Sequence, residues 1–253
     1  SLGCHIDQAQ ASRCAQPGSQ EGRISHVDFL KLNGTFAHFI VSQKEAVIGL
    51  DRFGSMSVFY SKTESNELVA STGYQSLLRF LKKSDAGGLQ ESSIFEFLYM
   101  RRLFGEKTYH SGIRRMNAGS TLRFSFASSQ IRQANYWSPP NEKLLSQKEV
   151  ISALTHGINE STEMYLSDSG CRHGLLLSGG LDSRMLLAVG RERYTTFTTA
   201  RTINNEVEVA SNLAKQVESE HIYLQRQESY FADIFSRATI LSNAMTAFYE
   251  CQF

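Results

Sequence analysis

Between residues 32 and 138, apolar and polar residues alternate in short runs, which is the period of half-buried strands. The runs come in three pairs of predicted strands, at residues 34–53, 57–72 and 120–137. Between the second and third pairs, apolar residues at helical spacing predict a helix over 93–102. This half of the chain is therefore predicted to be strand-rich, with one or two helices.

The pattern changes at two adjacent prolines, which interrupt both helices and strand ladders and predict a linker over 139–145. Ser146 and Glu149 have the spacing of a capping box and begin a predicted helix. The apolar stripe of this helix consists of Val150, Ile151, Leu154, Ile158 and Tyr165. Strands and helices then alternate, which predicts an α/β unit with a doubly wound parallel sheet over 146–253.

Composition and charge narrow the function classes. The chain has 253 residues, of which 41% are hydrophobic, enough for two domains with cores. Its formal net charge of +1 gives no overall field that would favour nucleic acid or a membrane surface, and no apolar run reaches membrane-spanning length. The cysteines are too far apart for a disulfide framework or a zinc site, which favours a reducing cytoplasm. They are Cys4, Cys14, Cys171 and Cys251.

The strongest chemical signal is LLLSGGLDSRMLL at residues 175–187. The three leucines predict a strand covered on both faces, and the later apolar spacing predicts a helix. Gly179 and Gly180 can take φ values closed to other residues and let a ligand approach the backbone. The free N–H groups of a helix start favour an anion, and the hydroxyls of Ser178 and Ser183 add donors.

Asp182, in the same stretch, would repel a bare phosphate unless a divalent cation lay between them, so the loop is predicted to bind magnesium-bound phosphates. An ordinary turn with a helix cap is one alternative, although it needs fewer glycines and polar side chains. A hydrolase nucleophile elbow needs glycine where Leu176 stands. The P-loop of nucleotide hydrolases needs a lysine after Gly180, which is absent.

The segment from Leu177 to Ser183 resembles the L-S-G-G-L-D-S loop of the asparagine synthetase family, which belongs to the pyrophosphatase-loop synthetases. Other segments resemble motifs of this family in the family's order, namely LNGTFAHFI, DRFGSMSVFY, TYHSGIRRMNAGSTL and NYWSP. Ser57 and Ala118 stand where these motifs have proline. The resemblance covers the chain from Leu32 onward.

The resemblance implies a fold and a chemistry. The fold would be an incomplete N-terminal-nucleophile-type glutaminase domain (α+β) over 32–138, followed by an incomplete synthetase domain over 146–253. The chemistry would use ATP and Mg²⁺ to activate a carboxylate as an acyl-adenylate, release pyrophosphate, and form an amide with ammonia from glutamine. Ser178, Gly179, Gly180 and Ser183 would hold the pyrophosphate, Asp182 would position the magnesium, and Leu177 would lie near the adenine.

The two ends of the chain depart from the family pattern. The family's glutaminase uses an N-terminal cysteine, whereas Cys4 follows three other residues. Residues 1–31 are polar and are expected to be poorly ordered or a remnant. The family's second synthetase motif, S-G-x-G-x-D-E, does not occur before Phe253. We therefore expect both catalytic centres to be incomplete and this chain alone to be inactive, and we assign no catalytic residue.

Three further polar residues follow the loop. Glu206 could support magnesium or substrate, but its place in a predicted first helical turn needs no function. Arg201 could reach a phosphate at the same sheet edge or be a solvated loop residue. His221 is expected to be structural.

The leading interpretation is a glutamine-dependent asparagine synthetase homologue. One alternative is an intramolecular amide-forming cyclase, because lasso-peptide cyclases and β-lactam synthetases resemble this family and lack a working glutaminase. A second is a degenerate domain that binds nucleotide or acts as a scaffold. The expected partners are small molecules, a carboxylate and glutamine or ammonia, and the sequence is compatible with a homodimer.

Overall fold

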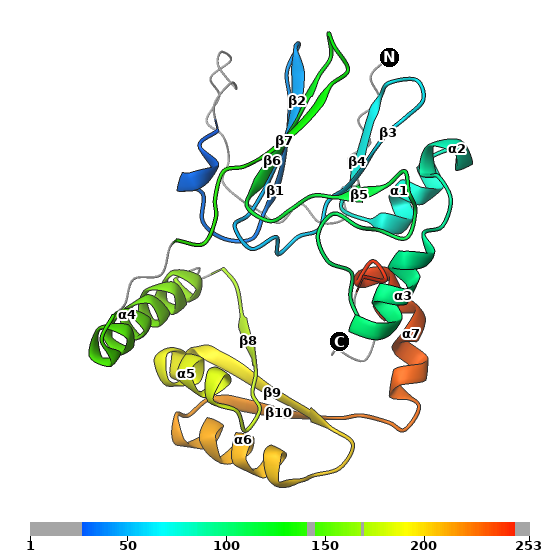
Figure 1. Cartoon of the computed structure of the whole chain (residues 1–253). Coiled ribbons are helices and arrows are strands. Elements are labelled where there is room, and N and C mark those ends of the chain that lie inside the picture. Colours follow the sequence, from blue (N-terminus) through cyan, green and yellow to red (C-terminus); the bar gives the residue numbers. More distant parts are fainter. Residues whose placement is uncertain (1–26, 141–144, 168–169, 246–253) are drawn as a thin grey trace. The chain divides into compact units, whose positions relative to one another are not determined.

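The computed structural model describes residues 27–140, 145–167 and 170–245 (Figure 1). The chain divides into two compact units, residues 1–138 (unit 1) and 139–253 (unit 2). Most of the segment 1–31, including Cys4, lies outside the described residues. Within its described part, a short 3-10 turn, η2 (Phe29–Lys31), places Phe29 in a buried cluster with Phe36 and Val47.

The described part of unit 1 contains two antiparallel sheets and three α-helices. The first sheet has the order β1-β2-β6-β7 and the second β4-β3-β5. The strands are β1 (Ala37–Val41), β2 (Glu45–Leu50), β3 (Phe59–Lys62), β4 (Leu68–Ser71), β5 (Arg114–Arg115), β6 (Ser120–Ser125) and β7 (Ile131–Asn135). The helices are α1 (Tyr74–Phe80), α2 (Lys83–Ala86) and α3 (Glu91–Met100). The three predicted strand pairs and the predicted helix are confirmed.

The core of unit 1 lies where its two sheets meet. One buried cluster takes Ile48 and Leu122 from the first sheet and Tyr60 from the second, together with Val58 and Met116. Strand β6 shows why the sequence alternates there. Its buried residues Ser120, Leu122 and Phe124 are separated by more exposed ones, because only one face of the strand packs into the core.

Unit 2 is built on three parallel strands in the order β10-β9-β8. The strands are β8 (His173–Leu176), β9 (Tyr194–Ala200) and β10 (Glu220–Gln225). The helices are α4 (Gln147–Leu166), α5 (Leu181–Gly190), the 3-10 helix η3 (Arg191–Arg193), α6 (Asn205–Gln216) and α7 (Tyr230–Leu241). The segment from β8 to β10 is a βαβαβ unit, the half from which doubly wound sheets are built. The predicted capping box of Ser146 and Glu149 is confirmed at the start of α4.

The sheet of unit 2 has one well-covered face. Leu175 and Leu177 pack against Leu187 of α5 and against Ala210 and Ala214 of α6. Both helices lie on this face because each parallel strand is added at the same edge by a right-handed crossover.

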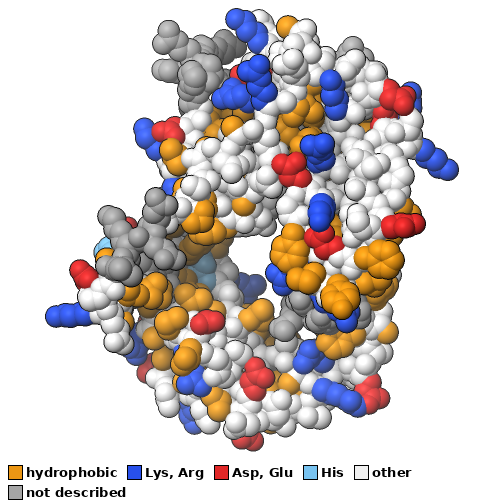
Figure 2. Space-filling view, in the orientation of Figure 1, with side chains coloured by type: hydrophobic (Ala, Val, Ile, Leu, Met, Phe, Trp, Pro, Cys, Tyr) orange, Lys and Arg blue, Asp and Glu red, His pale blue; other side chains and the backbone are white. Residues whose placement is uncertain are grey.

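The other face of this sheet carries Leu176, which is 58% exposed, and Phe197 is its register partner on β9. The prediction of a strand covered on both faces is therefore wrong. The predicted apolar stripe of α4 is also largely exposed at Val150, Ile151 and Leu154. Hydrophobic side chains are visible at the molecular surface in Figure 2.

Candidate functional site

The predicted phosphate loop begins at the carboxyl end of β8, the edge at which open parallel sheets bind ligands. Leu177 anchors it. Its N–H donates to the Phe197 carbonyl at 2.7 Å, and its own carbonyl accepts the Thr198 hydroxyl at 2.5 Å. Its side chain is buried in the core cluster. Leu177 therefore supports the loop from below, with its side chain in the core, and its place near adenine stays a prediction.

The loop itself is held by its two serines. The Gly180 N–H donates to the Ser178 hydroxyl at 3.2 Å. The Ser183 hydroxyl accepts from the Ser178 N–H and donates to the Ser178 carbonyl, each at 3.4 Å. The predicted cradle residues are thus brought together, and the serine hydroxyls that were predicted as ligand donors hold the loop's shape in the described structure.

The two glycines do not take the unusual φ values that glycine allows, and the approach of a ligand to their backbone stays a prediction. Gly180 has φ −77° and ψ 163°, and Gly179 is not among the described glycines with positive φ. A side chain at Gly180 would come within 3.1 Å of the Ser178 hydroxyl oxygen. Glycine is favoured at position 180 because the loop packs closely there, and not because the backbone is left-handed.

Helix α5 starts at Leu181 with no side chain capping it in the described part of the chain. Side chains cap α4, through its capping box, and α6, where Asn204 accepts the Val207 N–H at 3.1 Å, whereas α1, α2, α3 and α7 lack a side-chain cap as α5 does. A cap by Ser or Asp was the basis of the ordinary-turn alternative, so the absence of one weakens that alternative. The first N–H groups of α5 lie beside exposed residues, and the helix dipole there favours an anion.

Asp182 is exposed in the first turn of α5 and forms no ion pair with any residue that the structure describes. Among the same residues, no group of three or more His, Cys, Asp or Glu side chains could hold a metal ion. Magnesium commonly takes one or two carboxylates and completes its octahedron with water and phosphate oxygens. The single carboxylate of Asp182 fits a magnesium ion delivered with a nucleotide.

Two nearby residues extend the site beyond the motif. A side chain placed on Gly179 would lie 4.0 Å from Cγ of Glu206, so the start of α6 reaches the loop. Arg184 was not predicted, and its Nη2 donates to the Gly179 carbonyl at 2.6 Å. The sequence did contain a signal for Arg184. A cation in the first turn of a helix is unfavourable beside the positive end of the dipole, so its presence there indicates some other role.

Arg201 and His221 each contact a residue outside the loop. Arg201 forms an ion pair with Glu228. The Nδ1 atom of His221 is 2.9 Å from the Thr196 hydroxyl oxygen, and burial lowers the His221 pKa. The structure therefore places His221 in the packing of the sheet.

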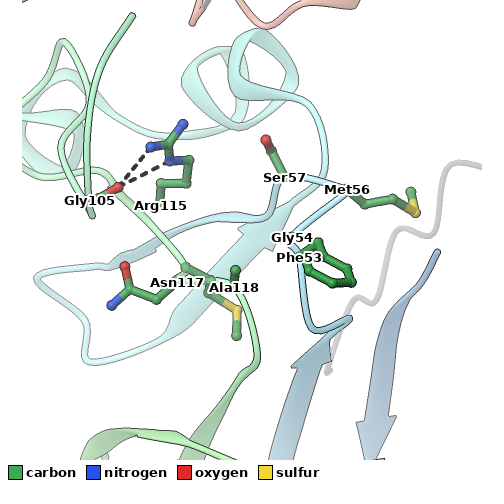
Figure 3. Close-up of a pocket in the computed structure, with 9 residues that line it drawn as sticks. Phe53, Gly54, Met56, Ser57, Gly105, Arg115, Asn117 and Ala118 are labelled. Carbon is green, nitrogen blue, oxygen red and sulfur yellow. Dashed lines mark hydrogen bonds between the residues drawn. The ribbon is translucent and has the colours of Figure 1, made fainter. Parts of the chain in front are cut away.

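Unit 1 has a pocket of about 290 Å³, shown in Figure 3. Ser57 and Ala118, the two positions where the motifs of unit 1 lack the family's proline, both line it. Arg115 also lines it and is held by the carbonyls of Leu103 and Gly105, each 2.9 Å from Nη2. Cys4, which is assigned no catalytic role from the sequence, is outside the described residues.

Comparison with known proteins defines the class of both units. Residues 24–137 match the family model of a glutamine amidotransferase domain, and residues 153–247 match that of asparagine synthase. An amidotransferase domain followed by an α/β synthetase domain is the arrangement that the two units show. Both units are therefore similar to domains of the asparagine synthetase family.

One curated relative aligns over 165 residues at 23% identity, a Methanocaldococcus jannaschii protein provisionally named asparagine synthetase (glutamine-hydrolyzing) 2. The alignment covers 64% of this chain and 32% of the relative, so the chain spans about a third of that protein's length. In the described ranges, no helix combines the length and hydrophobicity needed to cross a bilayer.

Proposed function

We propose that unit 2 binds ATP with Mg²⁺ through the segment 178–183, and that the protein is an amide-forming ligase. In this proposal a carboxylate is activated as an acyl-adenylate with release of pyrophosphate, and ammonia from glutamine then attacks it. The observation that supports the proposal best is the uncapped start of α5 at the strand edge, within the family's loop sequence.

Each loop residue has a proposed task. The first N–H groups of α5 and the positive end of its dipole would stabilise the charge that accumulates on the departing pyrophosphate. Ser178 and Ser183 keep these groups in place before the nucleotide binds. Mg²⁺, held by Asp182, would neutralise phosphate charge between the carboxylate and the leaving group. Glutamine as the nitrogen source is supported by the amidotransferase match of unit 1.

The decisive experiment is calorimetric titration of ATP into the wild type and Asp182→Asn, each with and without magnesium. Asparagine keeps the size of the side chain but removes its charge, so we expect binding with magnesium to weaken by roughly 1–3 kcal/mol. Without magnesium, the two proteins should bind ATP about equally weakly.

Glu192→Gln is the matched control, because it removes a carboxylate at the opposite end of α5, in η3. This variant should bind ATP as the wild type does. Equal affinities for wild type and Asp182→Asn under all four conditions would leave the loop as a turn and refute the proposed function.

A further inference from the structure

Arg184 occupies an electrostatically unfavourable position. It lies in the first turn of α5, where the positive end of the helix dipole disfavours a cation. Its guanidinium reaches back over the preceding loop, and Nη2 donates to the carbonyl of Gly179 at 2.6 Å in a partly buried setting. This is the short distance of a charge-assisted hydrogen bond, which is stronger than a neutral one.

The bond from Arg184 holds the peptide of the loop whose rotation is least restricted by side chains. The peptide between Gly179 and Gly180 has no Cβ on either side, so its rotation meets little steric resistance. Arg184 holds the carbonyl end of this peptide, and the Ser178 hydroxyl holds its N–H end at 3.2 Å. Both ends are therefore fixed without any ligand.

The orientation of this peptide matters for an anion site. A loop that binds phosphate must present N–H groups and turn its carbonyl oxygens away, because a carbonyl dipole repels an anion. A carbonyl held by a guanidinium is not presented to an anion.

Arg184 also bears a cost that loop packing alone does not explain. Its Nε atom is buried and has no hydrogen-bond acceptor among the residues that the structure describes. A buried donor without an acceptor lowers the stability of the folded state, so this atom of Arg184 does not stabilise the fold.

From these observations we infer that Arg184 is a positioning residue for the phosphate loop. It fixes the Gly179–Gly180 peptide so that the start of α5 is ready for the nucleotide phosphates before they arrive. The inference rests on the proposed function of the loop. It assigns Arg184 no contact with the reacting atoms.

The test compares Arg184→Gln and Arg184→Lys with the wild type by titration of three probes. These are ATP with magnesium, inorganic pyrophosphate with magnesium, and adenosine. Arg184→Gln should bind the two phosphate probes roughly 10- to 100-fold more weakly, because its bond to Gly179 would no longer be charge-assisted. Arg184→Lys should also lose affinity, but less, because its ammonium is a charged donor on a shorter side chain than the guanidinium. Adenosine affinity should not change, whereas general damage to unit 2 would lower it too.

Arg193→Gln is the control variant. Arg193 donates from Nε to the Gly190 carbonyl at 3.2 Å, at the opposite end of the same helix, and from both Nη atoms to Glu163, so its substitution removes more bonds than that of Arg184, but far from the loop. It should leave pyrophosphate affinity unchanged. Full affinity in Arg184→Lys would show that charge alone suffices and would overturn the positioning role, as would full affinity in Arg184→Gln.

A second measurement does not depend on how the variants fold. Hydrogen exchange of the wild-type segment 178–183 should show a protected Gly180 amide before nucleotide is added. Protection that appears only with nucleotide would overturn the inference while leaving the proposed function intact. If the wild type binds neither ATP nor pyrophosphate, the proposed function fails, and this inference fails with it.

Discussion

Leu122 of β6 in unit 1 and Leu176 of β8 in unit 2 are both strand leucines, but the first is fully buried and the second is 58% exposed. In β6, apolar residues alternate with polar ones, and alternation itself specifies which face is buried. At the end of β8, Leu175 and Leu176 of the strand and Leu177 after it are apolar on both faces, so the pattern does not indicate which face packs. The comparison shows that a short apolar run identifies a strand without specifying its environment.

The largest expected effect on stability comes from substituting the buried leucines Leu122 and Leu177. Leu122→Ala and Leu177→Ala should each lower the free energy of unfolding of their own unit by roughly 2–5 kcal/mol, because each leaves a cavity in a buried cluster. Leu176→Ala should change it by no more than about 0.5 kcal/mol, as expected at an exposed position.

Chemical denaturation can separate the two units. Trp137, the chain's single tryptophan, packs against Phe53 in unit 1, with ring centroids 5.5 Å apart. Tryptophan fluorescence should therefore report the unfolding of unit 1 in Leu122→Ala. Far-ultraviolet circular dichroism should report the unfolding of unit 2 in Leu177→Ala. If Leu176→Ala lowers the free energy of unfolding as much as Leu177→Ala does, the comparison of the two sheet faces is contradicted.

An intermediate effect is expected at Asp51, a buried carboxylate in unit 1. It accepts the N–H groups of Phe53 and Ser55 at 3.0 and 3.1 Å, and the Phe36 N–H at 3.3 Å. Asp51→Ala removes these acceptors and should lower the free energy of unfolding by roughly 2–3 kcal/mol, measured by tryptophan fluorescence. Asp51→Asn keeps one acceptor oxygen and should lose less. The prediction is wrong if the two variants are equally stable.

The smallest effect concerns pH and unit 2. Burial lowers the pKa of His221, so the folded state binds fewer protons than the unfolded state below the ordinary histidine pKa of 6.5. Stability from the neutral ring is therefore complete above pH 6.5 and is lost as the pH falls from there through the folded-state pKa.

The measurement is the melting temperature of unit 2 by circular dichroism, at about pH 7.5 and pH 5.5. On acidification, the melting temperature of the wild type should fall more than that of His221→Asn. The asparagine does not titrate and keeps an amide donor for the Thr196 hydroxyl. His110 of unit 1, whose pKa burial also lowers, is unchanged in both proteins and contributes equally. An identical acid-induced shift in both would exclude His221 as its source.

Much of the fold could be predicted because it is local. The first hairpin turns where the Ser42 hydroxyl accepts the N–H groups of Lys44 and Glu45, and β1 and β2 pair around it. The helix start at Ser146 is equally local, since its capping box closes within one turn. Such features depend on residues that are near neighbours in the sequence, so a pattern of a few positions is enough.

The candidate site could be predicted in part. The residues of 178–183 do come together, because one strand, one turn and one helix bring them there. Two features of the site could not be predicted, for the same reason. Leu177 is buried through its contacts with α5 and α6, and Arg184 acts on a carbonyl of the preceding loop. Neither follows from a motif, because both depend on how the chain folds back over the sheet.

The sequence by itself determined the strand pairs of unit 1, the alternation of strands and helices in unit 2, and the position of the phosphate loop between β8 and α5. Periodicity and hydrogen bonds between near neighbours are sufficient for these. Only the tertiary structure decided which face of β8 is covered, that Leu177 supports the loop, and that Arg184 holds Gly179. The physical reason is that burial and side-chain reach depend on crossovers between distant segments, and no local pattern encodes where those segments finally lie.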